Sequence, residues 1–449
     1  MKTRLLFLFD YLRTSFWFIP LVMAAGAVTL ALALVALDHT LEKEFKHDLP
    51  WTYSGGPEGA RMVLSVLASS MITVAGVVFS ITIVTLTLAS SQFGPRLLRG
   101  FIRDRANQAV LGTFLATFLF CLLVLRTVRN DDHGNFVPAV SVVAGLLLGL
   151  ASLGVLIFFI HHTSTSIQAT QVIANVASEL MHVVDQLFPT EIGEPGYGTR
   201  TIPPIPEVGG QEVRSRRSGY VMAINDELLM NLATGLDLLV RLEMRPGEFV
   251  VSGDLLARTW SGKSLEDTDL KGLADSFELG SERSMLQDVE FGIDQLVEIA
   301  VRALSPGIND PFTAMSCIDR LRQALTRIIE RPVPSPYRFD QSGRLRTVAF
   351  PVSFERSLGT AINQIRHYGR TSAPVLMVLM RTLHHLAQTA TRLEDLQTIE
   401  EQAPRTIRSG ERYLEDEEER RQLQLRFEAV QRASAAGQAK AIQHGKATP

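Results

Sequence analysis

Four long apolar stretches in the first third of the chain constrain this protein more than any other feature. A helix that crosses a bilayer needs about 20 predominantly apolar residues, and each stretch approaches or exceeds that length. None has Asp, Glu, Lys or Arg in its interior. The sequence therefore predicts four transmembrane helices and excludes an ordinary soluble protein or a disordered chain. The stretches are residues 16–37, 62–90, 110–125 and 137–161.

The first stretch follows a basic N-terminus that contains Lys2, Arg4 and Arg13, as a signal peptide would. Its apolar run is about 22 residues long, whereas the apolar core of a signal peptide has about 7–15. We therefore expect the first stretch to be a retained helix.

Basic residues in short loops predict the orientation, because they favour the cytoplasmic side. The N-terminus and the loop after the second stretch are basic, whereas the loop over residues 38–60 is mainly acidic. We expect a multi-pass protein of the bacterial inner membrane with both termini in the cytoplasm, although Arg126 and Arg129 run against the rule. The basic residues after the second stretch are Arg96, Arg99, Arg103 and Arg105. Gly94 and Pro95 end that helix, so these arginines are expected to anchor the chain to anionic lipid headgroups; an anion-binding or voltage-sensing role is the alternative.

The second stretch differs from the others in its many hydroxyl residues. At helical spacing, several of them and one glycine fall on a single stripe. The stripe is formed by Ser65, Ser69, Thr73, Gly76, Ser80, Thr87 and Ser91, and Ile83 and Val84 interrupt it. Small and hydroxyl residues allow helices to pack closely in a bilayer. The same stripe could instead line a water-filled path with Ile83 and Val84 as its hydrophobic constriction.

The remainder of the chain predicts a mixed but mainly α-helical cytoplasmic domain. The fold class is thus a four-helix integral membrane domain joined to a cytoplasmic domain with a small β-module. The fourth helix has no breaker at its end and is expected to continue as an amphipathic stalk. The predicted segments are the membrane domain 1–162, the stalk 163–187, a Pro/Gly linker 188–213, the β-module 214–262, the helical part 263–432 and a disordered tail 433–449.

Two motifs identify a family resemblance. One is the run ALSPGINDPFTA over residues 303–314, and the other is SSQFGPR over residues 90–96. Together they resemble a bacterial family of predicted inner-membrane proteins that is catalogued as a domain of unknown function. In the first motif, Ser305, Pro306, Gly307 and Asn309 form a turn, and Asp310 and Pro311 are expected to cap and start the next helix. A ligand at this helix N-terminus is the alternative.

No set of residues predicts catalysis, a metal or a cofactor. The sequence lacks a phosphate-binding glycine loop, a zinc motif and a nucleophile elbow, and its cysteines, Cys121 and Cys317, are far apart. The net charge of −3 gives no reason to expect nucleic acid as a partner. The row Glu290, Asp294 and Glu298 is expected to form salt bridges, and a divalent cation or general-acid role is its alternative.

The leading hypothesis is a channel-like homo-oligomer that conducts passively. Ion-coupled pumps bury ionisable residues near the bilayer midplane, and the four stretches have no such carboxylate. The cytoplasmic domain would control the path. The alternative is a membrane-anchored sensor or scaffold whose cytoplasmic domain binds a protein or a small ligand. We do not expect an enzyme.

Overall fold

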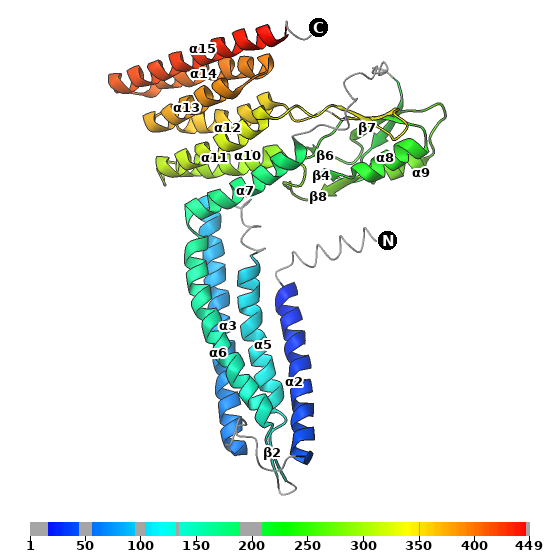
Figure 1. The fold of residues 1–449 in the computed structure, drawn as a ribbon, viewed down its shortest axis with the longest axis vertical. Coiled ribbons are helices and arrows are strands. Elements are labelled where there is room, and N and C mark those ends of the chain that lie inside the picture. The colour runs from blue at the N-terminus through cyan, green and yellow to red at the C-terminus, as the bar shows by residue number, and fades with distance from the viewer. Residues whose placement is uncertain are drawn as a thin grey trace. The chain divides into compact units, whose positions relative to one another are not determined.

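The structure, a computed structural model, describes residues 17–44, 56–94, 104–131, 134–188, 209–349 and 351–445. The chain forms two compact units, Met1–Gln171 and Val172–Pro449 (Figure 1). The predicted fold class is confirmed, since four long apolar helices precede a mixed region with small sheets. Most of the predicted linker lies outside the described residues.

The first unit contains four helices that are long and apolar enough to cross a membrane. They are α2 (Phe18–Glu44), α3 (Pro57–Phe93), α5 (Arg105–Leu125) and α6 (Ala139–Ser166). The strands β1 (Arg129–Asp131) and β2 (Gly134–Phe136) form a short antiparallel hairpin between α5 and α6. Figure 1 shows the four helices running side by side.

Helix α5 is the centre of this unit, because it contacts α2, α3 and α6. Half of its most apolar window is buried, against about a fifth for each of the other three helices. Small side chains make the close approach possible: Ala27 and Ala31 of α2 and Ala60 and Ala68 of α3 belong to one buried cluster with Phe120 of α5. The opposite faces of α2, α3 and α6 remain exposed on the single chain.

The second unit has a helical part in which successive helices pack against one another. Helix α10 packs on α11 and α12, α11 on α13, and α13 and α14 on α15. The helices of this unit are α7 (Ala169–Leu187), α8 (Asp226–Gly235), α9 (Asp267–Ala274), α10 (Val289–Ala303), α11 (Pro311–Glu330), α12 (Phe354–Tyr368), α13 (Ala373–Thr389), α14 (Leu393–Tyr413) and α15 (Glu417–Gly445). Leu180 of α7 lies against Gly292 of α10, where only a glycine leaves room for it.

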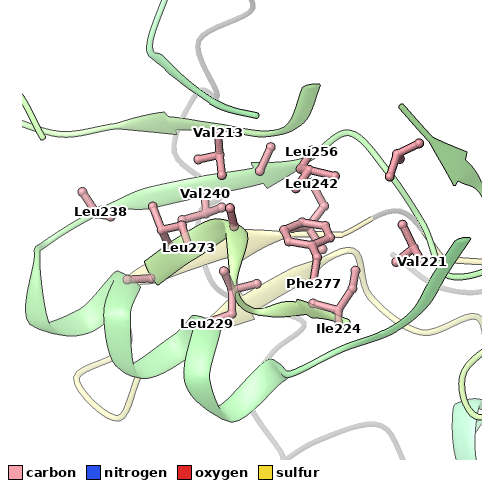
Figure 2. Close-up of a cluster of buried hydrophobic side chains, with 14 residues drawn as sticks. Val213, Val221, Ile224, Leu229, Leu238, Val240, Leu242, Leu256, Leu273 and Phe277 are labelled. Carbon is pink, nitrogen blue, oxygen red and sulfur yellow. The ribbon is translucent and has the colours of Figure 1, made fainter. Parts of the chain in front are cut away.

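Two sheets form the β-module of this unit. One has the strand order β3-β7-β5-β10-β9 and the other β6-β4-β8. The strands are β3 (Gln211–Arg214), β4 (Gly219–Ile224), β5 (Leu239–Leu242), β6 (Phe249–Val250), β7 (Leu255–Trp260), β8 (Phe277–Gly280), β9 (Tyr337–Phe339) and β10 (Leu345–Val348). Val221, Leu229, Val240, Leu256 and Phe277 belong to the apolar core that lies between the strands and α8 (Figure 2).

The structure corrects four of the predicted segments. Helix α6 ends at Ser166 and α7 begins at Ala169, so the stalk is not a continuation of the fourth helix. The β-module extends beyond 214–262, because β8 and the hairpin β9–β10 join its sheets and β10 pairs in parallel with β5. The part predicted to be helical, 263–432, therefore includes the strands β8, β9 and β10.

The fourth correction concerns the tail. Residues 433–445, predicted to be disordered, continue helix α15. Ser434 is buried, and an added side-chain carbon at Gly437 would lie 3.0 Å from Leu396 of α14. Disorder was predicted from the low apolar content of this segment. The prediction was wrong because alanine and glycine are small enough to pack closely on a neighbouring helix.

Candidate functional site

All residues of the hydroxyl stripe on α3 are exposed on the single chain. The stripe consists of Ser65, Ser69, Thr73, Gly76, Ser80, Thr87 and Ser91. The buried face of α3 is a different one, formed by Ala60, Leu64, Ala68, Ala75, Val78, Thr85, Ala89 and Phe93. The stripe therefore does not serve the packing of α3 against the other helices of its own chain.

The stripe is narrow and has apolar borders. At about 100° per residue, its seven positions fall within an arc of about 80°. Ile72 and Phe79 are exposed on one side of the arc, and Val77 and Ile81 on the other. Ile83 and Val84, the predicted constriction, are 46% and 55% exposed and lie at the edges of the arc.

Four hydroxyls of the stripe donate to carbonyls of their own helix, those of Ser69, Thr73, Thr87 and Ser91. The Oγ1 of Thr73 donates to the Ser69 carbonyl at 2.8 Å, and that of Thr87 donates to the Ile83 carbonyl at 2.9 Å. Such bonds satisfy a hydroxyl donor without water and leave its oxygen able to accept from water or from a neighbour. An added side-chain carbon at Gly76 would meet nothing within 4 Å, so this face is open for a partner or for water.

Two acids that the sequence analysis did not single out hold the ends of the helix bundle. Asp38, near the end of α2, is 6% exposed and accepts from the backbone N–H groups of Val140 at 2.9 Å and Ser141 at 3.0 Å. It also accepts from the Ser141 hydroxyl at 2.6 Å. Val140 and Ser141 lie in the first turn of α6. The carboxylate of Asp38, which belongs to α2, therefore caps the start of α6.

The second acid is Asp104, which caps α5. Its Oδ1 accepts from the Ala106 N–H at 2.9 Å, and its Oδ2 lies 2.6 Å from Nε2 of His162 on α6. Of the four arginines predicted to anchor the chain, Arg105 is exposed beside this cap. The other three, Arg96, Arg99 and Arg103, lie outside the described residues.

The signature turn joins α10 to α11 as predicted, with Asp310 as cap and Pro311 as the first helical residue. The Oδ1 of Asp310 accepts from the N–H groups of Phe312 and Thr313, each at 3.1 Å, and its Oδ2 accepts from the Thr313 hydroxyl at 2.6 Å. These bonds hold the pKa of Asp310 below its usual range. Asn309 has φ 51°, a left-handed conformation that asparagine tolerates better than most residues. Both carboxylate oxygens of Asp310 thus accept hydrogen bonds at the start of α11.

The turn also places two large apolar side chains on the surface. Ile308 is 48% exposed and Phe312 is 75% exposed. Ser305 lies at the start of the turn, where its carbonyl accepts from the N–H groups of Ile308 and Asn309, and Pro306 and Gly307 are exposed.

Each member of the acidic row on α10 faces an arginine. Glu290 lies 2.8 Å from Arg356, Asp294 lies 2.7 Å from Arg283, and Glu298 lies 3.5 Å from Arg302. The Glu298–Arg302 pair is the i, i+4 contact that the spacing predicts, whereas Arg356 and Arg283 lie outside α10. Among the described residues, no group of three His, Cys, Asp or Glu side chains could hold a metal ion.

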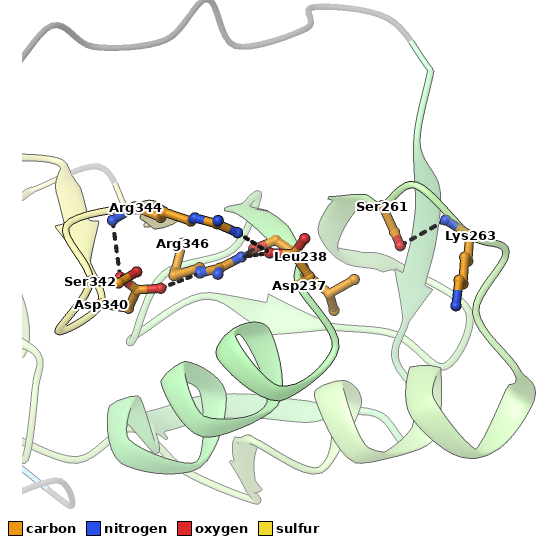
Figure 3. Close-up of polar contacts among 8 residues, drawn as sticks. All are labelled: Asp237, Leu238, Ser261, Lys263, Asp340, Ser342, Arg344 and Arg346. Carbon is orange, nitrogen blue, oxygen red and sulfur yellow. Dashed lines mark hydrogen bonds and ion pairs between the residues drawn. The ribbon is translucent and has the colours of Figure 1, made fainter.

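A further ion-pair cluster fixes the hairpin β9–β10 to the β-module (Figure 3). The Arg346 side chain is 7% exposed and bridges Asp237, at 2.6 Å, and Asp340, at 2.7 Å. The Ser342 hydroxyl and Arg346 hold the pKa of Asp340 well below its usual range. Sequence reasoning missed this cluster, because Asp237 and Arg346 are more than 100 residues apart and no local pattern connects them.

Comparison with known proteins identifies the family. Residues 13–385 match the family described as "Predicted membrane protein (DUF2254)". The chain belongs to this family. The match includes all four apolar helices and the β-module and ends within α13, so α14 and α15 follow it. The resemblance inferred from the two motifs is thereby confirmed at the level of the family.

Similar proteins occur in mycobacteria. Uncharacterized proteins of Mycobacterium bovis and Mycobacterium tuberculosis are each 33% identical to this chain over 424 residues. The aligned region is 92% of this chain and 79% of each relative. No solved structure matches the chain.

Proposed function

We propose that this member of the DUF2254 family is a channel-like homo-oligomer of the bacterial inner membrane. Copies of α3 would surround a passive path lined by the hydroxyl stripe, and the second unit would lie in the cytoplasm and control the path. The observation that carries the proposal is that the whole stripe is exposed while the opposite face of α3 packs within its own chain.

The length of the stripe supports a path across the bilayer. Ser65 and Ser91 are separated by 26 positions, which at about 1.5 Å per residue corresponds to about 39 Å. The hydrocarbon core of a bilayer is about 30 Å thick. A contact between two helices needs small residues over only a few turns, whereas a water path needs polar positions through the whole thickness.

The composition of α3 supports passive conduction. Between Met62 and Phe93 the helix has no Asp, Glu, Lys, Arg or His. Hydroxyl oxygens would interact only weakly with a passing solute, as release on the other side requires. Ile83 and Val84 near the inner end would close the path by excluding water. The basic residues at the N-terminus and after α3 favour the orientation with both termini in the cytoplasm.

The oligomeric mass in mild detergent tests the first requirement. Light scattering on the purified full chain should give a mass of more than two subunits. A monomer or dimer has too few copies of α3 to surround a path. In planar bilayers, Thr73→Leu with Ser80→Leu should abolish conductance. Ser70→Leu is the matched control, since Ser70 is exposed on the same helix outside the stripe. Unchanged conductance in the double variant would reject the stripe as the lining.

The exposed side chains of the signature turn favour a second candidate function. Ile308 and Phe312 lie on the surface of the second unit, where large apolar side chains often mark a protein contact. In a sensor or scaffold, the four apolar helices would only anchor this surface. A partner that copurifies with the full chain but not with Phe312→Ser, together with a monomeric or dimeric mass, would support the scaffold over the channel.

A further inference from the structure

Three arginines of the second unit lie close together where α12 meets α14. Arg366 is a half-buried residue of α12, and Arg405 and Arg408 are exposed residues of α14. Arg366 is fixed by a hydrogen bond from its Nη1 to the Ser409 hydroxyl at 3.1 Å. Burial and the positive charges of Arg405 and Arg408 lower the pKa of Arg366. The contact between the two helices is therefore a region of unbalanced positive charge.

Arg366 is not satisfied by the described residues. Its Nε is buried and has no hydrogen-bond acceptor. Within the described parts of the chain, Arg366 and Arg408 have no ion pair, and Arg405 has one distant partner, Glu401 at 3.8 Å. A buried donor without an acceptor is unfavourable, because it has lost its hydrogen bonds to water and gained none in return.

Two other partly buried arginines of this unit, Arg283 and Arg346, are paired with carboxylates. Arg283 lies between Asp288 and Asp294, at 2.8 and 2.7 Å. Arg346 lies between two aspartates in the same way. Whereas Arg283 and Arg346 are each compensated by two carboxylates, the guanidinium group of Arg366 has none among the described residues, and an external anion would supply the missing negative charge.

The surroundings of Arg366 are polar as well. Gln402, Thr406 and Ser409 are spaced along one face of α14 and are all buried. The Oε1 of Gln402 and the Oδ1 of Asn363 on α12 are buried without a hydrogen-bond partner. Amide oxygen and nitrogen positions are interchangeable by a flip of the side chain. The contact between α12 and α14 thus has further donor capacity beside the three arginines.

We propose that Arg366, Arg405 and Arg408 form a binding site for a phosphate-type oxyanion. A guanidinium group presents its N–H donors in a fixed plane that matches two oxygens of a phosphate. The bound oxyanion would accept from the guanidinium groups of Arg366, Arg405 and Arg408 and neutralise the repulsion among them. The site takes either a free phosphate compound or the phosphate of a lipid headgroup, and it is independent of the proposed channel.

Calorimetric titration of the full chain in phosphatidylcholine nanodiscs tests the site. Inorganic phosphate and dihexanoyl phosphatidic acid are the two probes. Saturable binding of either probe is expected, and Arg366→Gln and Arg408→Gln should each raise its Kd about tenfold or more. Arg426→Gln removes one exposed charge from the neighbouring helix α15 and should leave the Kd unchanged. Tighter binding of the short lipid would assign the site to headgroups, and equal or tighter binding of phosphate would assign it to free phosphate compounds.

The exposed Arg408 separates binding from folding. In phosphate-free buffer, Arg408→Gln should unfold at the same or a higher temperature than the unsubstituted protein, because it removes a like-charge repulsion. Added phosphate should raise the unfolding temperature of the unsubstituted protein more than that of Arg408→Gln. Absence of saturable binding of both probes, or equal Kd values for the unsubstituted protein, both site variants and Arg426→Gln, would overturn the proposal.

Discussion

Replacing Asp310 by alanine tests whether cap chemistry holds the signature turn. The substitution removes two backbone hydrogen bonds at 3.1 Å and one from the Thr313 hydroxyl at 2.6 Å. Loss of an N-cap costs about 0.5–2 kcal/mol, and the third bond places Asp310 in the upper part of this range. We therefore expect a loss of about 1–2 kcal/mol in the stability of the second unit. This corresponds to a population of opened molecules that is about 5–30 times larger.

The chain contains its own probe for this measurement. Cys317 is fully buried on α11, seven residues after Asp310, and burial together with the Asp310 charge raises the pKa of its thiol. A thiol reagent should therefore label it only after opening. In a Cys121→Ala background, Asp310→Ala should be labelled about 5–30 times faster than the parent. Asp310→Ser, which can still cap, should be labelled at nearly the parent rate.

Asp319→Ala serves as the matched control for the loss of a carboxylate. Asp319 lies on the same helix and forms exposed ion pairs with Arg322 and Arg381, which contribute less than about 1 kcal/mol each. Removal of the Asp319 carboxylate should change the labelling rate of Cys317 less than removal of the Asp310 carboxylate does. Equal rates for the parent, Asp310→Ala and Asp319→Ala would refute the cap as the element that holds the turn.

The pH dependence of the Asp310 effect has a defined sign. The folded-state pKa of Asp310 is lowered, so its charge-dependent stabilisation is present above the unfolded pKa of about 3.9. It is lost as the pH falls through the lower folded-state pKa. The stability difference between the parent and Asp310→Ala should thus be constant from neutral pH to about pH 5 and decrease below about pH 4. A difference that already disappears near pH 6 would contradict this assignment.

Two further substitutions test the packing of the two units. Asp38→Ala should destabilise the first unit by about 2–3 kcal/mol, because three donors at the start of α6 lose a buried carboxylate. Faster labelling of Cys121 in a Cys317→Ala background would report this loss, and an unchanged rate would show that Asp38 does not cap α6. Gly292→Ala places a carbon 2.9 Å from both Leu180 and Met285, so it should lower the unfolding temperature of the second unit. Gly235→Ala has open space at its position and should not lower it, and equal shifts for the two variants would contradict close packing at Gly292.

The sequence predicted those elements whose determinants are local. The four apolar helices follow from length and hydropathy, because a bilayer imposes both on every spanning segment. The cap of α11 was predictable because Asp310 and Pro311 have defined roles at a helix start. The hairpin β9–β10 also has a local determinant, the turn in which Gly343 N–H donates to the Asp340 carbonyl.

Elements that depend on distant contacts were missed. Helix α14 has Pro404 in its interior, and its apolar face of Leu396, Ile399, Ala403 and Ile407 is buried by neighbouring helices. The parallel pairing of β10 with β5 joins segments about 100 residues apart, for which a single sequence has no local signal. The unpaired Arg366 was likewise invisible, because its environment is created only when α12 and α14 meet.

The most direct test of the central claim measures whether water reaches the stripe of α3. Single cysteines are introduced at Thr73 and Ser80, and for comparison at the exposed apolar positions Ile72 and Val77, in a background without Cys121 and Cys317. A charged methanethiosulfonate reagent, which does not cross membranes, reacts with the thiolate and therefore requires water at the site. If the stripe lines a water-filled path, the cysteines at 73 and 80 should react about tenfold faster or more than those at 72 and 77. Equal and slow reaction at all four positions would show that the stripe faces lipid or a dry helix contact, and would contradict the channel.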